Sequence, residues 1–484
     1  HFIEYDKKDK RIPEFYDNIL SVLTKVNDFP RLETMQRGMI KFFDTRNVWY
    51  EANNRDEEAV KAAMSLKENN LLLLANHYHK QAEKTNAKAS YLQASKDYAQ
   101  FLELFPESKH AYFVNAYYAD ILYDPLEDYP KAIEQYSSVI KRDKKGEYVE
   151  DAALGIIYCY EALMDQKGLK ESGKAKKVKV VKLSADEIKK RQGPIERTEL
   201  HELERGFIDA SDQYVDLLSD LLEDPEIRKK NPERGEKIPE VMFISAQVFY
   251  EHGQFAQAIK RLQTLFDYDQ NHEYAAYAVN TMLDCYVRLR YWDEIDTWAT
   301  KLIEAKNFKV KKKSQLNKIR AMAKGEKARD LTAEKKFDAA IDENMSVYKE
   351  FKRSSPDIAS KALYNVGAIH AGAKRLPKAI KTYKRVTKEF AKEDIAPIAL
   401  FTIGEIYESQ TQFKKAAETF ESMTKFPKHE MTADAVFNAG LIREAIGDYS
   451  GAIKSYKKYL KTFKTAEDRA ELELQIGRVY EMMG

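Results

Sequence analysis

Cysteine is scarce in this sequence, with only Cys159 and Cys285 among 484 residues. Two widely separated cysteines exclude a disulfide framework as the basis of the fold. Long apolar runs are also missing. The most conspicuous, LLLLA at residues 71–75, is far shorter than the about 20 residues that a membrane-spanning helix requires. Because 80 basic residues face 78 acidic ones, the overall charge excludes a general attraction to nucleic acid or membranes.

Catalytic and cofactor-binding signatures are absent as well. The sequence has no G-x-x-x-x-G-K-[ST], G-x-G-x-x-G, G-x-S-x-G or H-E-x-x-H motif. His201 in HELE lacks a second histidine, and the HYH at residues 77–79 places its imidazoles on different faces of a helix. We expect these histidines to be surface or seam residues and both cysteines to be buried. The sequence therefore predicts a non-enzymatic protein with no cofactor and no metal site.

What the sequence does contain is an internal repeat. Gly367, Gly404, Gly440 and Gly477 are spaced 37, 36 and 37 residues apart. After each of the first three, an alanine follows at 12 residues and an aromatic ring at 16. These residues are Ala379 and Tyr383, Ala416 and Phe420, and Ala452 and Tyr456. A period in the thirties, with apolar residues three and four apart, predicts stacked pairs of antiparallel helices.

The repeated small residues have a physical interpretation. Two helices approach to about 8–10 Å only where small side chains lie at the crossing. We interpret the glycine of the first helix and the alanine of the second as that close contact. The ring is then expected to cover the seam and to pack against the next unit.

These units resemble the tetratricopeptide repeat (TPR). The stretch GDYSGAIKSYKKYL carries Gly447, Tyr449, Ala452, Tyr456 and Tyr459 in the order of that family. Roughly nine units can be followed in phase from about residue 69 to the end. The resemblance implies an all-α fold, a right-handed superhelical solenoid with an N-terminal helical cap and one large insertion.

Four segments are expected along the chain. Residues 1–68 are predicted to be an N-terminal helical capping segment, because their amphipathic helices do not fit the repeat. TPR-like units follow at 69–166 and 206–484, and a Lys-rich insertion at 167–205 lies within one unit. The last unit stops after its first helix, which would fit a native chain continuing past Gly484.

The insertion is strongly basic, with seven lysines between Lys167 and Lys182 against one acid. One interpretation is a solvated loop, and the other is a docking element for an acidic partner or polyanion. The absence of arginine and aromatic residues from the run argues against nucleic acid. The candidate residues for binding there are Lys174, Lys176, Lys177, Lys179 and Lys182.

The helix after the insertion is acidic. Its aspartates are spaced 3, 4 and 4 residues apart and form one stripe, opposite an apolar face predicted to be buried. A solvated outer face is one interpretation of the stripe, and a weak, salt-sensitive contact with the Lys-rich loop is the other. A regular helix cannot wrap its carboxylates around calcium. The stripe is Asp209, Asp212, Asp216 and Asp220, and the apolar face is Phe207, Tyr214, Leu218 and Leu221.

The TPR resemblance implies a partner-binding groove lined by the first helices. Rings lie three residues before the helix glycine or its equivalent, and they are expected either to contact a peptide segment or helix of a partner protein or to pack the wall. The lysine and asparagine pattern with which some TPRs clamp a C-terminal carboxylate is missing. The candidates are Phe243, Tyr364, Phe401 and Phe437, with Gln247, Tyr250, Glu405, Glu408 and Glu444 further along the same helices.

The repeat style also resembles bacterial envelope TPR proteins, on stretches such as FLELFPESKHAYFVNAYYADIL. Those proteins include the lipoprotein of the outer-membrane β-barrel assembly machine, the Tol–Pal-associated coordinator and gliding-motility complex proteins. The resemblance implies a scaffold in the periplasm or envelope, with the cytoplasm as the alternative. Two other functions stay open: a regulatory arm of an enzyme outside the visible chain, and a cell-wall or polyanion binder using the Lys-rich insertion.

Overall fold

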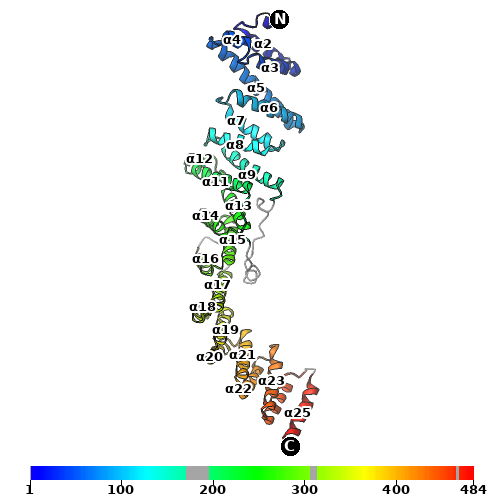
Figure 1. The fold of residues 1–484 in the computed structure, drawn as a ribbon, viewed down its shortest axis with the longest axis vertical. Coiled ribbons are helices and arrows are strands. Elements are labelled where there is room, and N and C mark those ends of the chain that lie inside the picture. Colours follow the sequence, from blue (N-terminus) through cyan, green and yellow to red (C-terminus); the bar gives the residue numbers. More distant parts are fainter. Residues whose placement is uncertain (1, 170–195, 306–312, 465–467) are drawn as a thin grey trace. The chain divides into compact units, whose positions relative to one another are not determined.

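The computed structural model describes residues 2–169, 196–305, 313–464 and 468–484. All regular secondary structure in these residues is helical, which confirms the prediction of an all-α fold (Figure 1). The described residues up to Thr281 form one compact unit, and those from Met282 onward form another. The division falls inside α15 (Glu273–Leu289).

In the first unit, consecutive helices pack chiefly against their neighbours in the chain. This order is the TPR-type helix stacking that the repeat predicts. The helices are α1 (Phe2–Tyr5), α2 (Ile12–Lys25), α3 (Phe29–Phe42), α4 (Val48–Asn53), α5 (Glu57–Thr85), α6 (Lys88–Leu104), α7 (Ala111–Tyr123), α8 (Tyr129–Arg142), α9 (Val149–Gln166), α11 (Glu202–Leu222), α12 (Pro225–Lys230), α13 (Ile238–Glu251) and α14 (Phe255–Tyr268).

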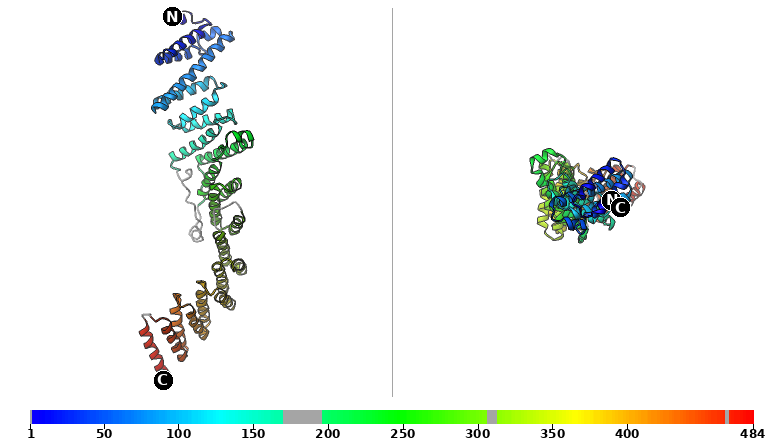
Figure 2. Two further views of the ribbon diagram at one scale, coloured as in Figure 1. Left: turned by 180° about the vertical axis from the view of Figure 1, so that it is seen from behind. Right: turned by 90° about the horizontal axis from the view of Figure 1, so that it is seen from above.

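The second unit continues the same arrangement, with antiparallel pairs following one another from α17 onward (Figure 2). Its helices are α16 (Trp292–Glu304), α17 (Lys313–Ala333), α18 (Phe337–Phe351), α19 (Pro356–Gly372), α20 (Leu376–Glu389), α21 (Ile395–Ser409), α22 (Phe413–Glu421), the short 3-10 helix η1 (Ser422–Lys425), α23 (Met431–Ala445), α24 (Tyr449–Thr462) and α25 (Arg469–Met483).

A left-handed turn residue joins the two helices of most pairs. In nine turns of the described chain, a residue with φ between 52° and 77° lies two positions before the second helix. Glycine adopts this conformation without strain, whereas other residues rarely do. Only two of the nine are glycines. The nine are Asn27, Asn86, Glu127, Gly253, Arg290, Lys335, Lys374, Thr411 and Gly447.

The same turn links α2 to α3, inside the segment predicted to be a cap. Helix α5 then runs without a break through residues 68 and 69, where the sequence analysis placed the start of the repeats. It packs against α2 and α3 on one side and α6 on the other. One helix thus serves both the capping segment and the first repeat.

The glycines of the repeat have a different partner from the one expected. A Cβ built on Gly440 would lie 2.1 Å from Cε1 of Tyr456, and one on Gly404 would lie 2.4 Å from Cε1 of Phe420. The ring therefore lies directly against the glycine of its own pair, while Tyr456 also belongs to a core cluster with Leu472 and Ile476 of the next helix. Because a methyl group would occupy the space of the ring, glycine and ring form one contact.

Helix α11 begins at Glu202, four residues before the position 206 at which the repeats were predicted to resume. His201 is its N-cap: its ring Nδ1 accepts from the backbone N–H of Leu203, and Glu204 accepts from the backbone N–H of His201 at 2.7 Å. This reciprocal capping box fixes the start of the helix. The HELE sequence therefore has a structural role as a helix start.

Candidate functional site

Three of the candidate rings occupy equivalent positions on first helices of the second unit. Tyr364 on α19, Phe401 on α21 and Phe437 on α23 are each half-buried. Each ring packs against an aromatic residue of the following second helix and stays partly exposed. The ring centroids are 5.0 Å apart for Tyr364–Tyr383, 5.2 Å for Phe401–Phe420 and 6.0 Å for Phe437–Tyr456.

Glu405 lies one turn beyond Phe401 on α21. Its carboxylate has no hydrogen bond or ion pair with any described residue, and it is exposed at the helix surface. Partial desolvation of the carboxyl group by the surrounding protein, together with the neighbouring charge of Glu408, raises the pKa of Glu405. A carboxylate that lacks a cation in the free protein is suited to receive one from a partner.

Glu444 is held within the protein, unlike Glu405. Its carboxylate accepts hydrogen bonds from the Tyr456 hydroxyl at 2.9 Å and from the Gln475 amide at 2.9 and 3.0 Å. These bonds tie α23 to α24 and α25. Glu444 therefore positions neighbouring helices, and a partner would have to compete with these internal donors.

The candidates on α13 of the first unit are more enclosed. Phe243 is 1% exposed, with its ring centroid 5.5 Å from that of Tyr274 and 6.0 Å from that of Tyr277. The expectation of an outward groove ring is therefore wrong at this position, because two tyrosines of α15 cover it. Tyr250 is half-buried and packs against Phe255 at 5.9 Å, and Gln247 is half-buried beside it.

The acidic stripe of α11 divides into two kinds of residue. Asp212 accepts two hydrogen bonds from Arg261 of α14, at 2.5 and 2.6 Å. Asp209, Asp216 and Asp220 are exposed and form no ion pair with a described residue. The opposite face of Phe207, Tyr214, Leu218 and Leu221 is buried, as predicted.

The insertion is described only at its ends. The candidate residues Lys174, Lys176, Lys177, Lys179 and Lys182 lie outside the described residues, as does any contact they make with the acidic stripe. Near the end of the insertion, Thr198 is attached to the turn between α13 and α14. Its N–H donates to the His252 carbonyl at 3.1 Å, and its carbonyl accepts from the Gln254 amide at 2.8 Å.

His252 completes this attachment, which the local sequence pattern did not indicate. Its Nδ1 lies 2.6 Å from the Thr198 hydroxyl, and its Nε2 lies 2.9 Å from the Glu204 carboxylate. The partners lie about 50 residues apart in the sequence, so no periodic signal connects them. The network joins the end of the insertion, the start of α11 and the following pair.

The histidines and cysteines noted in the sequence occupy packed positions. His77 stacks on Phe29 with ring centroids 3.5 Å apart, and His79 Nδ1 lies 3.1 Å from the Tyr98 hydroxyl. Cys159 and Cys285 are buried and free, as predicted, and burial raises the pKa of the Cys159 thiol to about 12. In the part of the chain that the structure describes, no cluster of three or more potential ligands could hold a metal ion. No helix there is both long and apolar enough to span a bilayer.

Comparison with known families supports the repeat assignment. Residues 434–466 match the family model described as tetratricopeptide repeat, which covers nearly all of α23 and α24. The chain therefore carries the TPR predicted from the glycine, alanine and ring spacing. The pairs α19–α20 and α21–α22 repeat its glycine–ring contact.

Other comparisons add little. No curated protein matches the sequence. Among solved structures, the chain is similar to one entitled "Crystal Structure of the Yeast Tom70", at 13% identity over 86% of this chain and 97% of that chain, with a TM-score of 0.21. At this identity and TM-score the likeness carries no information about function.

Proposed function

We propose that this chain is a non-enzymatic scaffold that binds segments of partner proteins along the first helices of its repeats. The observation that carries the proposal is the matched TPR whose first-helix ring, Phe437, is half-buried and is repeated by Tyr364 and Phe401. Large rings that are already held by packing lose little conformational freedom on binding, so they suit recognition. The unpaired carboxylate of Glu405 beside them favours a segment that carries a positive charge.

Site-specific photo-crosslinking in cells of the source organism tests this proposal. A photoreactive residue in place of Glu405 reports on the first-helix surface, and one in place of Glu418, exposed on α22, is the matched control. We expect a discrete protein adduct from position 405 and none from position 418. Equal adducts from both positions, or none from either, would contradict binding at the first helices.

A second experiment tests whether the rings of the three first helices contribute to the affinity for the partner. The triple variant Tyr364→Leu, Phe401→Leu and Phe437→Leu keeps apolar packing but removes the rings. We expect at least a tenfold loss of affinity for the crosslinked partner, with unchanged circular dichroism. Unchanged affinity would assign the rings to wall packing alone.

We further propose a bacterial envelope or motility-type assembly as the setting. The support is the similarity of repeat style described above. Fractionation of the source cells, with protease protection of intact and osmotically shocked cells, tests it. Protection that is lost only on opening the outer membrane would support a periplasmic location, and a cytosolic distribution would contradict it. The apparent mass of the protein in the same preparation shows whether an enzyme domain is attached to the repeats.

A further inference from the structure

Two cavities in the first unit lie against the same face of α9. One, of about 420 Å³, includes Ala153 and Ile156 of α9 in its lining. The other, of about 500 Å³, includes Tyr160 and Leu163. These four residues are three or four apart and therefore share one helix face. Both cavities are bounded by α8 on one side and α11 on the other.

The order of the lining residues places the two cavities end to end along α9. Along α8, Ile133 lines the second cavity and Ile140 the first. Along α11, Gly206 lines the second and Leu217 the first. The order is reversed along α9, where Ala153 and Ile156 line the first cavity and Tyr160 and Leu163 the second, so α9 runs opposite to α8 and α11. We call the two cavities together the α9 trough. Its floor runs from Ala153 to Leu163, ten residue steps later, or about 15 Å at the rise of an α-helix.

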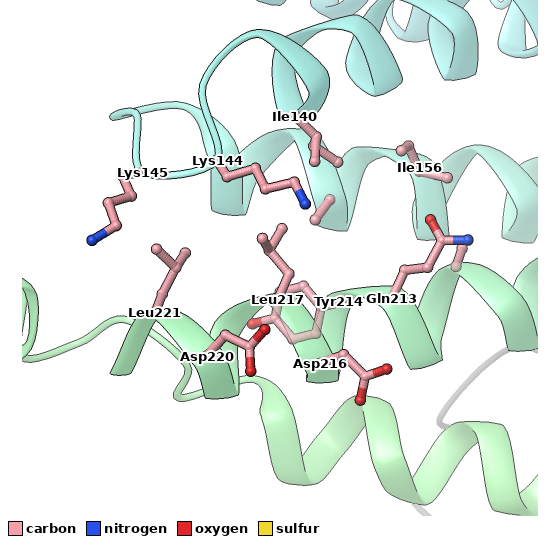
Figure 3. A pocket seen from close by; sticks show the side chains of 12 residues that line it. Ile140, Lys144, Lys145, Ile156, Gln213, Tyr214, Asp216, Leu217, Asp220 and Leu221 are labelled. Atoms are coloured by element: carbon pink, nitrogen blue, oxygen red, sulfur yellow. The ribbon is translucent and has the colours of Figure 1, made fainter. Parts of the chain in front are cut away.

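The banks of the α9 trough differ in charge. Figure 3 shows Leu217 and Leu221 pointing from α11 toward α8 and α9, whereas Asp216 and Asp220, which also line the cavity, point away from those two helices. Asp209 lines the other end of the same bank. As described above, these three carboxylates have no cation among the described residues. The α11 bank is therefore an acidic edge beside an apolar floor.

The basic residues near the trough do not neutralise that edge. Arg205, which lines the second cavity four residues before Asp209, forms an ion pair with Glu199 at 3.7 Å. Lys145, at the end of the α9 trough, forms an ion pair with Asp224 at 3.2 Å. Lys144 extends from the loop between α8 and α9 across the apolar side chains (Figure 3). It forms no ion pair with a described residue. The uncompensated negative charge thus lies along α11, and one free positive charge lies opposite.

We propose that the α9 trough is a second docking site, for a basic amphipathic helix of a partner protein. The apolar stripe of that helix lies over Ile156 and Tyr160, and its Lys or Arg residues face Asp209, Asp216 and Asp220. The aspartates are 7 and 4 residues apart, which is the spacing of side chains along one edge of a partner helix lying alongside α11. The proposal rests on the scaffold function and extends it to a surface formed mainly between second helices.

Charge complementarity decides between possible occupants. An acidic helix would place like charges beside three uncompensated carboxylates, which costs free energy. A purely apolar helix would leave the carboxylates near a desolvated interface without a partner. An amphipathic helix with basic residues on one edge can pack its apolar side chains on the floor of the trough and pair its charges with the carboxylates of α11.

Selection from a displayed peptide library on the full chain tests the proposal. The library contains 20-residue helical peptides with a fixed apolar stripe and randomised flanking positions. We expect enrichment of Lys and Arg on one flank and binding that weakens with salt. No enrichment, or enrichment of neutral or acidic flanks, would overturn the proposal.

Two matched variants locate the binding. The trough variant is Asp209→Asn, Asp216→Asn and Asp220→Asn. The control removes the same charge from exposed acids elsewhere, by Asp342→Asn, Glu418→Gln and Glu430→Gln. We expect the affinity for the enriched peptide to fall at least tenfold in the trough variant and to be unchanged in the control. Leu217→Ala, which removes part of the apolar bank without changing charge, is expected to weaken binding as well.

The remaining outcomes separate this proposal from the scaffold function. Peptides that are lost only with the variant Tyr364→Leu, Phe401→Leu and Phe437→Leu would support binding at the first helices and overturn the α9 trough. Peptides affected by neither set of changes would overturn both assignments. If the chain self-associates and the trough variant abolishes this, the occupant of the α9 trough would be a second copy of this protein and not a partner helix.

Discussion

Two stretches of the second unit hold their helices together in different ways. Between α19 and α24, each first helix presents a glycine against which a ring of the second helix lies, as in Gly440 and Tyr456. Between α16 and α18, the contacts flanking α17 include a ladder of ion pairs. The distances are 2.7 Å for Arg320–Asp296, 2.5 Å for Arg320–Glu350, 2.7 Å for Lys327–Asp293 and 2.7 Å for Lys327–Glu343.

The difference explains why the repeat is clear in one stretch and weak in the other. A ring against a glycine is a contact of shape, and a single added carbon would collide with it. Long charged side chains reach their partners from several positions and rotamers, so their spacing is free to drift. The spacing of glycine, alanine and ring is therefore strict where the helices pack by shape. It is weak where ion pairs contribute to the contact between helices.

The largest effect is expected at the contact that both stretches share. Ala416 in α22 and Ala340 in α18 are each 0% exposed. We expect Ala416→Leu and Ala340→Leu to destabilise the chain by about 3 kcal/mol each, because a larger side chain overpacks the helix crossing. Urea denaturation measures the change. A small effect at Ala340 alone would mean that the ion-pair stretch is loosely packed throughout.

The next effect separates the two stretches directly. A Cβ on Gly404 would meet the ring of Phe420, whereas a Cβ on Gly325, within α17, would have no atom within 4 Å. We expect Gly404→Ala to destabilise by about 2 kcal/mol. Gly325→Ala is expected to stabilise by about 1 kcal/mol through helix propensity.

Thermal melts of the two variants provide the comparison. Adding Phe420→Leu to Gly404→Ala is expected to cost less than Phe420→Leu alone, because the added methyl group then has room. Changes of the same sign at both glycines would contradict the assignment of the ring contact to one stretch.

The helix pairs were predictable from sequence because their signals are local. The spacing of Gly404, Ala416 and Phe420 specifies two helix faces and the turn between them. The turn itself was only partly predictable. A glycine signals it at Gly447, but Thr411 adopts the same left-handed conformation with no such signal, with φ of 56°. Backbone hydrogen bonds close that turn, since the N–H groups of Thr411 and Gln412 donate to the carbonyls of Glu408 and Tyr407.

The candidate site was less predictable, because exposure depends on neighbours from other repeats. Phe243 and Phe401 occupy equivalent positions in the repeat, yet Phe243 is buried under tyrosines of the next first helix. Asp212 belongs to the acidic stripe by spacing, but Arg261, 49 residues later, neutralises it. Contacts of this kind have no periodicity in the sequence. The α9 trough was missed for the same reason, since it requires three helices to be placed together.

A pH-dependent effect is expected at Glu389, which connects α18 to α20. Although burial opposes it, hydrogen bonds from Lys352, Tyr348 and Arg385 lower the pKa of Glu389 to about 2. Its carboxylate accepts from the Tyr348 hydroxyl at 2.6 Å and from Lys352 at 2.7 Å. We expect Glu389→Gln to cost about 1–2 kcal/mol at pH 7, after allowance for solvent screening.

The sign follows from the lowered pKa. A carboxyl group that ionises more readily in the folded state stabilises the protein above its unfolded pKa of 4.5, and this contribution is lost as the pH falls from there toward 2. The difference in unfolding free energy between wild type and Glu389→Gln should therefore shrink over that range. A difference that is constant from pH 7 to pH 3 would assign the effect of the substitution to packing.

The smallest effect is expected for the ion-pair ladder itself. Arg320→Met removes a guanidinium that bridges α16 and α18, and partly exposed pairs of this kind contribute about 0–1 kcal/mol each. Lys349→Met is the matched control, because Lys349 is exposed on α18 and has no ion pair with a described residue. We expect a loss of about 1 kcal/mol for Arg320→Met in low salt that falls markedly at 1 M salt, where the screening length is only about 3 Å. The control should change little in either condition. A loss for Arg320→Met that salt does not reduce would show that the aliphatic chain of Arg320, and not its charge, holds α17 between α16 and α18. The two stretches would then differ in the length of the side chains at their contacts and not in the kind of force.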